Sequence, residues 1–216
     1  MNEKIKFIGQ GFQDLFVYTV LNGKKNGYFI EIGSAVPDHD NNSYILEKNL
    51  NWTGFMVEYR EEFRNIYKEI RPNSIHYIQD ATTINYYDEL IKHNYPLNLD
   101  YLQIDLEVEN RSTLDVLEIF DKTVFPTYKF ATVTFEHDFY RGNYFNTKEL
   151  SRIIFEKWGY VRVFTDVKMD DVQVGPWEDW YVHPDLVNMN YINTIKKDVS
   201  VDYKNIINLL TSKSIN

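Results

Sequence analysis

The stretch Gly27-Tyr28-Phe29-Ile30-Glu31-Ile32-Gly33-Ser34 decides the fold, together with Gly54-Phe55-Met56-Val57-Glu58 further along the chain. An apolar run that ends in Glu-x-Gly predicts a buried strand followed by a turn tight enough to need glycine. The second run predicts another buried strand that ends in a single carboxylate. In a doubly wound sheet these two strand ends lie side by side, and the acid of the second strand can accept hydrogen bonds from a ribose diol. The pair therefore indicates a cofactor that contains a nucleoside.

Length and composition exclude several classes of protein. The 216 residues suit one α/β domain, and 44% hydrophobic with 25% charged residues is ordinary for a globular chain. A net charge of -9 argues against a protein that grips nucleic-acid phosphates or an anionic membrane. The absence of cysteine excludes disulfides, thiolate catalysis and cysteine-ligated metals. We read no signal peptide and no apolar run of about 18 residues, so a cytoplasmic setting, in the producing or a host cell, is expected.

Apolar runs and helical periodicities alternate along the chain. Strands are expected near 28–33, 54–58, 74–78, 100–105, 130–136, 160–165 and 180–183. Helices are expected near 11–21, 42–50, 60–70, 85–93, 111–120, 147–157 and 202–211. This alternation predicts a mostly parallel sheet with helices on both faces and ligands outside the carboxyl ends of the strands. No repeat or long linker divides the chain, so we expect one domain over 1–216, with an N-terminal helical segment (1–26), an α/β core (27–187) and a C-terminal helical tail (188–216).

The last two predicted strands, Tyr160 to Thr165 and Trp180 to His183, are joined by a loop without helical period. Such a loop favours an antiparallel hairpin at one edge of the sheet. Parallel strands followed by such a hairpin are the layout of the class I S-adenosylmethionine-dependent methyltransferases. We therefore expect a Rossmann-like α/β fold with a seven-stranded, mostly parallel sheet and a terminal antiparallel hairpin.

Four ordered stretches carry a resemblance to a known family. The run from Gly27 to Gly33 is followed by Asn42-Ser43-Tyr44-Ile45-Leu46-Glu47 and by Trp52 to Glu58, and a later block reads Asp100-Tyr101-Leu102-Gln103-Ile104-Asp105-Leu106-Glu107-Val108-Glu109. The chain thereby resembles the FkbM-type methyltransferases, which commonly read F-x-E-x-G, S-N-T-x-x-L-E, G-W-x-G-x-x-I-E-P and D-x-L-x-I-D-x-E-G-x-E. The resemblance covers about residues 10 to 165. It departs from the family where Ser34 and Ala35 follow Gly33 without a second glycine, and where Val108 stands in place of a glycine.

The resemblance implies a methyltransferase that uses S-adenosylmethionine and methylates a hydroxyl of a sugar, a glycan or a related small molecule. The expected cofactor contacts follow the first four strands: Glu31, Gly33, Ser34, Glu58, Tyr59, Asp80, Ala81 and Asp105. Glu31 and Gly33 would border the methionine moiety, or Glu31 instead caps the next turn. Glu58 is costly to bury unless something hydrogen-bonds it, and ribose hydroxyls would do so. Asp80 would accept the adenine amino hydrogen, or it starts a local turn.

Acids and one imidazole follow the fourth and fifth predicted strands. Asp105 ends the fourth strand, and Glu136, His137 and Asp138 end the fifth. Because these strands are neighbours in this fold, the four side chains are expected at one mouth near the transferred methyl group. They offer a general base, or a site for Mg²⁺ or Mn²⁺ with Asp105, Glu136 and His137 as ligands. Alternatively, some of the acids only cap helices.

Other interpretations remain open at this point. The aromatic segment Trp177 to His183 either stacks on a sugar ring or completes the core. The chain could be a methyltransferase fold without turnover that binds a nucleoside or serves as a scaffold. A nicotinamide-dependent oxidoreductase is less favoured, since residues 31–35 lack the glycines that a pyrophosphate requires. The expected partner is a small-molecule or glycan acceptor, without nucleic acid or membrane insertion, and an oligomer is compatible with the sequence but unsupported by it.

Overall fold

The computed structural model describes residues 5–169 and 175–212. Its strands are β1 (Tyr28–Ile32), β2 (Thr53–Glu58), β3 (Ile75–Ile78), β4 (Asn98–Ile104), β5 (Lys129–Glu136), β6 (Val161–Lys168), β7 (Glu178–Val182) and β8 (Lys197–Asp202). Its α-helices are α1 (Gln13–Val20), α2 (Tyr44–Leu50), α3 (Phe63–Ile70), α4 (Tyr86–Lys92), α5 (Ser112–Ile119), α6 (Thr147–Lys157), α7 (Met189–Ile195) and α8 (Tyr203–Ser212). Strands and helices alternate up to β6, as the sequence predicted.

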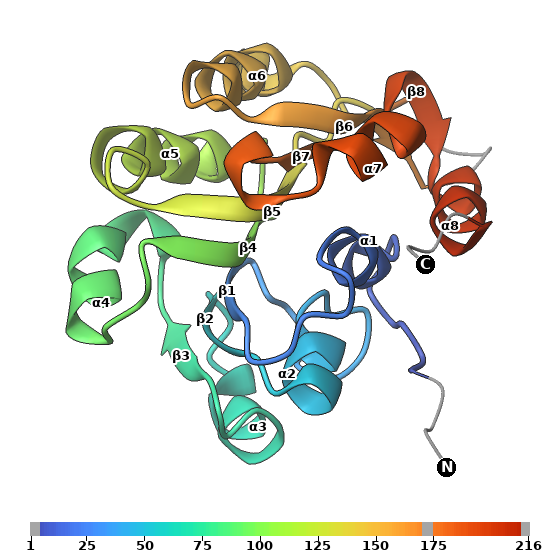
Figure 1. Cartoon of the computed structure of the whole chain (residues 1–216). Helices are drawn as coiled ribbons and strands as arrows, with labels where there is room; N and C mark the ends of the chain where they lie inside the picture. The colour runs from blue at the N-terminus through green and yellow to red at the C-terminus, as the bar shows by residue number, and fades with distance from the viewer. Residues whose placement is uncertain (1–4, 170–174, 213–216) are drawn as a thin grey trace.

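The strands form one sheet in the order β3-β2-β1-β4-β5-β7-β6-β8 (Figure 1). Neighbouring strands are parallel except where β7 pairs with β5 and with β6. Within the described residues, β7 is thus the strand that runs against all the others. A row of parallel strands that ends in an antiparallel hairpin confirms the predicted Rossmann-like class I methyltransferase fold.

The sheet has eight strands, one more than the sequence predicted. β8 pairs in parallel with β6 and forms the edge of the sheet, so the hairpin of β6 and β7 lies inside the edge rather than at it. The sequence of β8, Lys-Asp-Val-Ser-Val-Asp, is mostly exposed and has few apolar side chains, so its strand pattern is weak. The predicted helical tail therefore contains a strand as well. Part of the predicted loop before β7, residues 170–174, lies outside the described residues.

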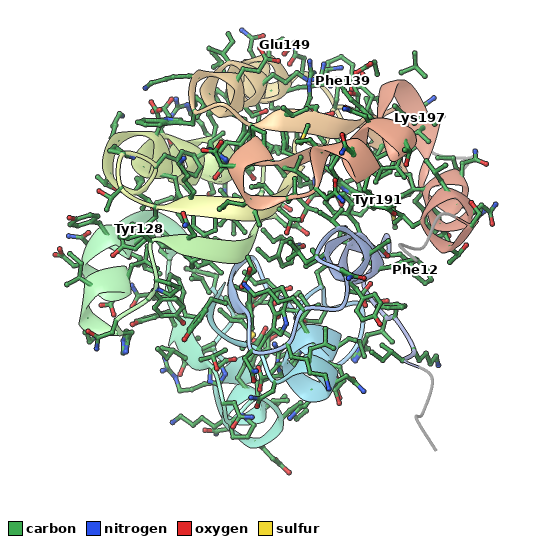
Figure 2. The ribbon with its side chains drawn as sticks, viewed as in Figure 1. Phe12, Tyr128, Phe139, Glu149, Tyr191 and Lys197 are labelled. Atoms are coloured by element: carbon green, nitrogen blue, oxygen red, sulfur yellow. The ribbon has the colours of Figure 1, made fainter. Side chains whose placement is uncertain are left out.

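Helices cover both faces of the sheet, with α4, α5 and α6 on one face and α1, α2, α3, α7 and α8 on the other (Figure 1). Side chains fill both layers between sheet and helices (Figure 2). On the first face the rings of Phe135 and Phe155 meet with centroids 5.5 Å apart. On the second face Phe16 of α1 meets Trp180 of β7 at 5.1 Å. Two apolar layers thus cover the faces of the sheet, and polar side chains lie at its carboxyl edge.

Candidate functional site

Backbone hydrogen bonds join the carboxyl ends of β1, β2 and β4. The amides of Gly33 and Ser34 donate to the carbonyl of Val57 at 2.9 and 3.0 Å. The amide of Asp105 donates to the carbonyl of Ile32 at 2.9 Å. The turn after β1 is therefore held between two neighbouring strand ends, which is where ligands bind in sheets of this kind.

Gly33 occupies the turn for which the sequence predicted a glycine. Its φ is +83°, and an added Cβ would lie 1.6 Å from the carbonyl oxygen of Asp105. The left-handed backbone and the close approach both exclude a side chain. Ala35 also has a left-handed φ, of 47°, although it carries a Cβ. The turn thus keeps a shape that favours glycine at a position where this chain has alanine.

Glu58 ends β2 next to this turn and is 7% exposed. Its Oε2 accepts a hydrogen bond from the amide of Ala35 at 2.8 Å. Its Oε1 accepts from the amide and from Nε of Arg60, both at 2.9 Å. The carboxylate is therefore fixed beside the turn after β1, as expected for an acid that recognises a ribose, and the ribose contact itself stays a prediction.

A cavity of about 410 Å³ opens between the ends of β2, β3 and β4. Its lining consists of Tyr59, Asp80, Ala81, Leu106, Glu107, Asn110 and Ser112. The structure thereby brings together three residues that the sequence predicted as cofactor contacts, one after β2 and two after β3. Tyr59 is 77% exposed, so its ring is free to cover a ligand in the cavity. Asp80 uses Oδ1 to cap the short turn that follows, accepting from the amide and hydroxyl of Thr82, so the local alternative for Asp80 holds at least in part.

Glu31 lies in β1 and is 1% exposed. Its carboxylate accepts hydrogen bonds from the hydroxyl of Ser43 and from the amide of Asn42. Burial raises the pKa of Glu31, whereas the nearby Arg71 lowers it. The structure thus uses Glu31 to tie the loop before α2 to the sheet, which is the turn-capping alternative. Its contact with the methionine moiety stays a prediction.

Arg71, which the sequence analysis missed, binds the loop between β1 and α2 through several hydrogen bonds. Its guanidinium is fully buried and pairs with the equally buried Glu47 at 2.8 Å. It also donates to the side chains of Asn41 and Ser43 at 2.9 and 2.8 Å and to the carbonyl of Pro37 at 3.2 Å. A single arginine at the end of a predicted helix gives no sequence signal for this role, because its partners lie 24 to 34 residues earlier.

Asp105 and Asp138 are the predicted catalytic residues that the structure brings close to each other. Burial, and next the carboxylate of Asp138, raise the pKa of Asp105 to about 7. Asp138 is 4% exposed and has a left-handed φ of 44°. Its Oδ2 accepts from Arg141 at 3.2 Å, whereas its buried Oδ1 has no partner within the described structure. Burial raises the pKa of Asp138 in spite of Arg141.

Glu136 and His137 have other partners. Glu136 accepts a hydrogen bond from the indole of Trp177 at 2.7 Å. The ring of His137 is fully buried, with Nε2 3.8 Å from Asp179 and Nδ1 accepting from the amide of Phe139. The ring of His137 is thus directed to Asp179, and the structure does not bring it to the mouth with Asp105. His137 and Asp138 both follow the end of β5, and the left-handed φ of Asp138 turns the chain there, so neighbouring side chains take different directions.

The predicted metal site of Asp105, Glu136 and His137 is not formed. In the described part of the chain, the group whose ligand atoms lie within 4.8 Å of one another is His137, Asp166 and Asp179. Arg152 already binds both acids of this group, at 2.8 Å to Asp166 and 2.6 Å to Asp179. This cluster is therefore an ion-pair network that joins α6, β6 and β7, and the geometry supports a metal at neither place.

Glu178 joins the acids of the mouth, although the sequence analysis did not single it out. It is 3% exposed and accepts hydrogen bonds from the side-chain amide of Gln13 and from the indole of Trp180. Burial raises its pKa well above the ordinary value, with further contributions from Asp105 and Asp138. Glu178 belongs to the segment Trp177 to His183, which the sequence analysis interpreted only through its aromatic residues. Trp177 and Trp180 are 2% and 0% exposed, so these rings complete the core rather than stack on a ligand.

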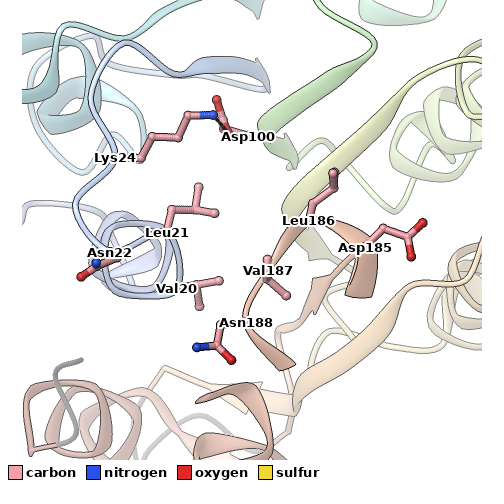
Figure 3. Close-up of a pocket in the computed structure, with 9 residues that line it drawn as sticks. All are labelled: Val20, Leu21, Asn22, Lys24, Asp100, Asp185, Leu186, Val187 and Asn188. Atoms are coloured by element: carbon pink, nitrogen blue, oxygen red, sulfur yellow. Dashed lines mark hydrogen bonds and ion pairs between the residues drawn. The ribbon is translucent and has the colours of Figure 1, made fainter. Parts of the chain in front are cut away.

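A larger cavity of about 620 Å³ lies at the opposite, amino edge of the sheet (Figure 3). It lies between the end of α1 and the segment from Asp185 to Asn188, and Lys24 pairs with Asp100 at 2.6 Å on its wall. No residue predicted for the cofactor or for catalysis lines it. Because ligands of such sheets bind at the carboxyl edge, the smaller cavity is the candidate cofactor site.

The sequence matches no protein-family model and no curated protein. Among solved structures, it is similar to a TehB-like S-adenosylmethionine-dependent methyltransferase from Corynebacterium glutamicum, at 8% identity over 79% of this chain and 87% of that one, with a TM-score of 0.48. It is also similar to a putative rRNA methylase from Clostridium thermocellum, at 10% identity over 79% and 92%, with a TM-score of 0.48. A precorrin-6y C5,15-methyltransferase from Geobacter metallireducens gives 13% identity over 78% and 86%, with a TM-score of 0.46. Similarity at this level concerns the fold alone, so the activity has to be inferred from the residues of this chain.

Proposed function

We propose that this chain is an S-adenosylmethionine-dependent methyltransferase that methylates a hydroxyl of a sugar, a glycan or a related small molecule. The observation that carries the proposal is the position of Glu58. This buried acid ends β2, is hydrogen-bonded to the turn after β1, and stands next to the cavity lined by Tyr59 and Asp80. A carboxylate in that place suits the two hydroxyls of a ribose, and the cavity beside it suits a purine.

The residues after β1 and β4 also suit the cofactor. Gly33 lets the turn after β1 approach the backbone carbonyl of Asp105 closely, since a Cβ would lie 1.6 Å from that oxygen. Asp105 lies on the far side of that approach, and no cationic side chain is paired with it in the described structure. A sulfonium or ammonium group beside Asp105 would be stabilised by its negative charge. Glu58, Tyr59, Asp80 and Ala81 are thus proposed for the nucleoside, and Gly33, Ser34 and Asp105 for the methionine end.

The cofactor supplies a methyl group, whose transfer to the acceptor oxygen breaks a sulfonium S–C bond and leaves S-adenosylhomocysteine. The protein has to orient the acceptor and remove its hydroxyl proton. Asp105, whose pKa is raised to about 7, matches the pKa that a general base needs near neutral pH. Asp138 is the second candidate base. Such a base contributes roughly 10²- to 10⁴-fold to the rate, and orientation supplies much of the rest.

Calorimetry tests the proposal directly. S-adenosylhomocysteine should bind to the purified protein, whereas NAD should not. Binding of NAD without binding of S-adenosylhomocysteine would favour an oxidoreductase. Transfer of a labelled methyl group from the cofactor to members of an acceptor library then separates an active enzyme from a nucleoside-binding scaffold, since a scaffold binds S-adenosylhomocysteine and transfers nothing to any of them.

The four ordered stretches that resemble the family support a finer proposal, that the chain is of the FkbM type. The net charge of -9 supports an acceptor other than a nucleic acid. None of the described helices combines the length and the apolar character needed to cross a bilayer. The cytoplasm as the site of action stays a proposal that rests on the sequence.

A further inference from the structure

Three acids, Asp105, Asp138 and Glu178, lie side by side at the carboxyl edge of the sheet, next to the candidate cofactor site. The sheet has the order β1-β4-β5-β7 in this region (Figure 1). Asp105 follows β4, Asp138 follows β5, and Glu178 begins the antiparallel β7, so all three lie at the same edge of the sheet. Backbone pairing brings these positions together: Ile104 pairs with Phe135, Glu136 pairs with Glu178, and the amide of Asp138 donates to the carbonyl of Trp177 at 3.0 Å. Gly33 and Glu58, which mark the cofactor side, lie on the other side of β4. Asp138 and Glu178 therefore belong to the acceptor side.

This row has an excess of hydrogen-bond acceptors over donors. Asp138 is 4% exposed, and its Oδ1 is buried without any partner in the described structure. Glu178 is held by the neutral donors of Gln13 and Trp180, and no ion pair of the described residues includes Glu178 or Asp105. The cation that touches the row is Arg141, which is shared among Asp138, Glu107 and Glu109. A buried acceptor without a donor is unfavourable unless a ligand supplies the donor.

The spacing of these acids distinguishes between kinds of ligand. A divalent cation needs several oxygen ligands within a few ångströms of each other. Asp105, Asp138 and Glu178 form no group whose ligand atoms all lie within 4.8 Å, since among the described residues only the ion-pair network around Asp179 does. A phosphate would be repelled by three carboxylates. An organic ammonium group carries its own donors and can bridge carboxylates that stand further apart.

We propose that Asp138 and Glu178 bind a protonated amine, so that the methyl acceptor is a hydroxyl compound bearing an ammonium group, as an amino sugar does. This assignment rests on the proposed methyltransferase function and adds the class of its substrate. Asp105 then serves the reacting hydroxyl, and Asp138 and Glu178 position the acceptor through its amine.

Matched pairs of sugars test the proposal. Glucosamine and glucose, and galactosamine and galactose, differ only by an amine in place of one hydroxyl. Added to the complex with S-adenosylhomocysteine, the amino sugars should bind about tenfold or more tightly than their partners, the range for hydrogen bonds to charged groups. The readout is calorimetry, supported by the melting temperature of the ternary mixture.

Two variants separate specific binding from general attraction to an acidic protein. Asp138→Asn should abolish the preference for the amine, and the fold should tolerate it because asparagine accepts the left-handed φ of this position. Glu109→Gln removes a charge from a side chain that is 45% exposed on the rim, and it should keep the preference. Equal binding of amine and hydroxyl partners, failure of both to bind, or an unchanged preference in Asp138→Asn would overturn the proposal. Failure of S-adenosylhomocysteine to bind would instead overturn the proposed function.

Discussion

Replacement of Glu58 is the sharpest test of the cofactor site. Its carboxylate accepts three hydrogen bonds from the protein, one from the amide of Ala35 and two from Arg60. Glu58→Ala removes the charged acceptor that we assign to the ribose, and loss of hydrogen bonds to a charged group costs about 1–3 kcal/mol. The affinity for S-adenosylhomocysteine should therefore fall by about 5- to 150-fold. The variant should also lose about 1 kcal/mol of unfolding free energy, because the Ala35 amide loses its partner.

Calorimetry measures the affinity, and urea unfolding measures the stability, so the two effects are separated. Glu58→Gln keeps the size of the side chain and removes its charge, so it should weaken binding with less loss of stability. Glu61→Gln is the matched control, since its side chain is 71% exposed in the next turn and pairs only with Arg64 in the described structure. If folded Glu58→Ala binds S-adenosylhomocysteine as tightly as the unmodified protein, Glu58 does not hold the ribose and the site has been misplaced.

Three further predictions concern the frame of the site. Ala35→Gly should raise the unfolding free energy by about 0.5–1 kcal/mol in urea titrations, because glycine removes the strain of the left-handed φ and returns part of that gain as chain entropy. Arg71→Met should lower it by about 3–5 kcal/mol by leaving Glu47 buried and unpaired, whereas Arg64→Met at the surface should change it little. The pKa of Asp105 is raised from 3.8 to about 7, so the folded protein retains a proton that the unfolded chain loses, and this group lowers stability as the pH rises between those values. Asp105→Asn should therefore stabilise the protein at pH about 8 but not at about 4, and equal thermal shifts at both would contradict the raised pKa.

The fold could be predicted from the sequence because its signals are local. Each inner strand is an apolar run of five to eight residues that ends at a polar residue or a turn, as from Tyr28 to Ile32 and from Thr53 to Glu58. The glycine at position 33 predicts a tight turn, and the structure confirms that no side chain fits there. β8 lacked such a signal, because an exposed edge strand buries too little apolar surface to need a pattern.

The candidate site was only partly predictable, because sequence position fixes which strand end a residue occupies but not where its side chain points. The position after β5 correctly brought Asp138 near Asp105. The neighbouring His137 is directed to Asp179 instead, which forms a separate network with Arg152. Glu178 and Gln13 are 165 residues apart and meet only in the folded chain. A single sequence contains no local signal for such a pair.

The carboxylates of the mouth require positive charge or hydrogen-bond donors, and both the cofactor and the acceptor could supply them. Asp138 and Glu178 are buried and Asp105 is half-buried where three adjacent strands meet the carboxyl edge of the sheet, and desolvation raises the pKa of each. Such carboxylates destabilise a fold unless positive charge or hydrogen-bond donors meet them, and Arg141 is the one cation that the described structure brings to the row. A sulfonium beside Asp105 and an ammonium beside Asp138 would each supply that charge. Binding of either should lower the pKa of its carboxylate and release protons. Calorimetry in buffers of different ionisation enthalpy counts those protons, and S-adenosylhomocysteine, which lacks the sulfonium charge, should release fewer than S-adenosylmethionine does.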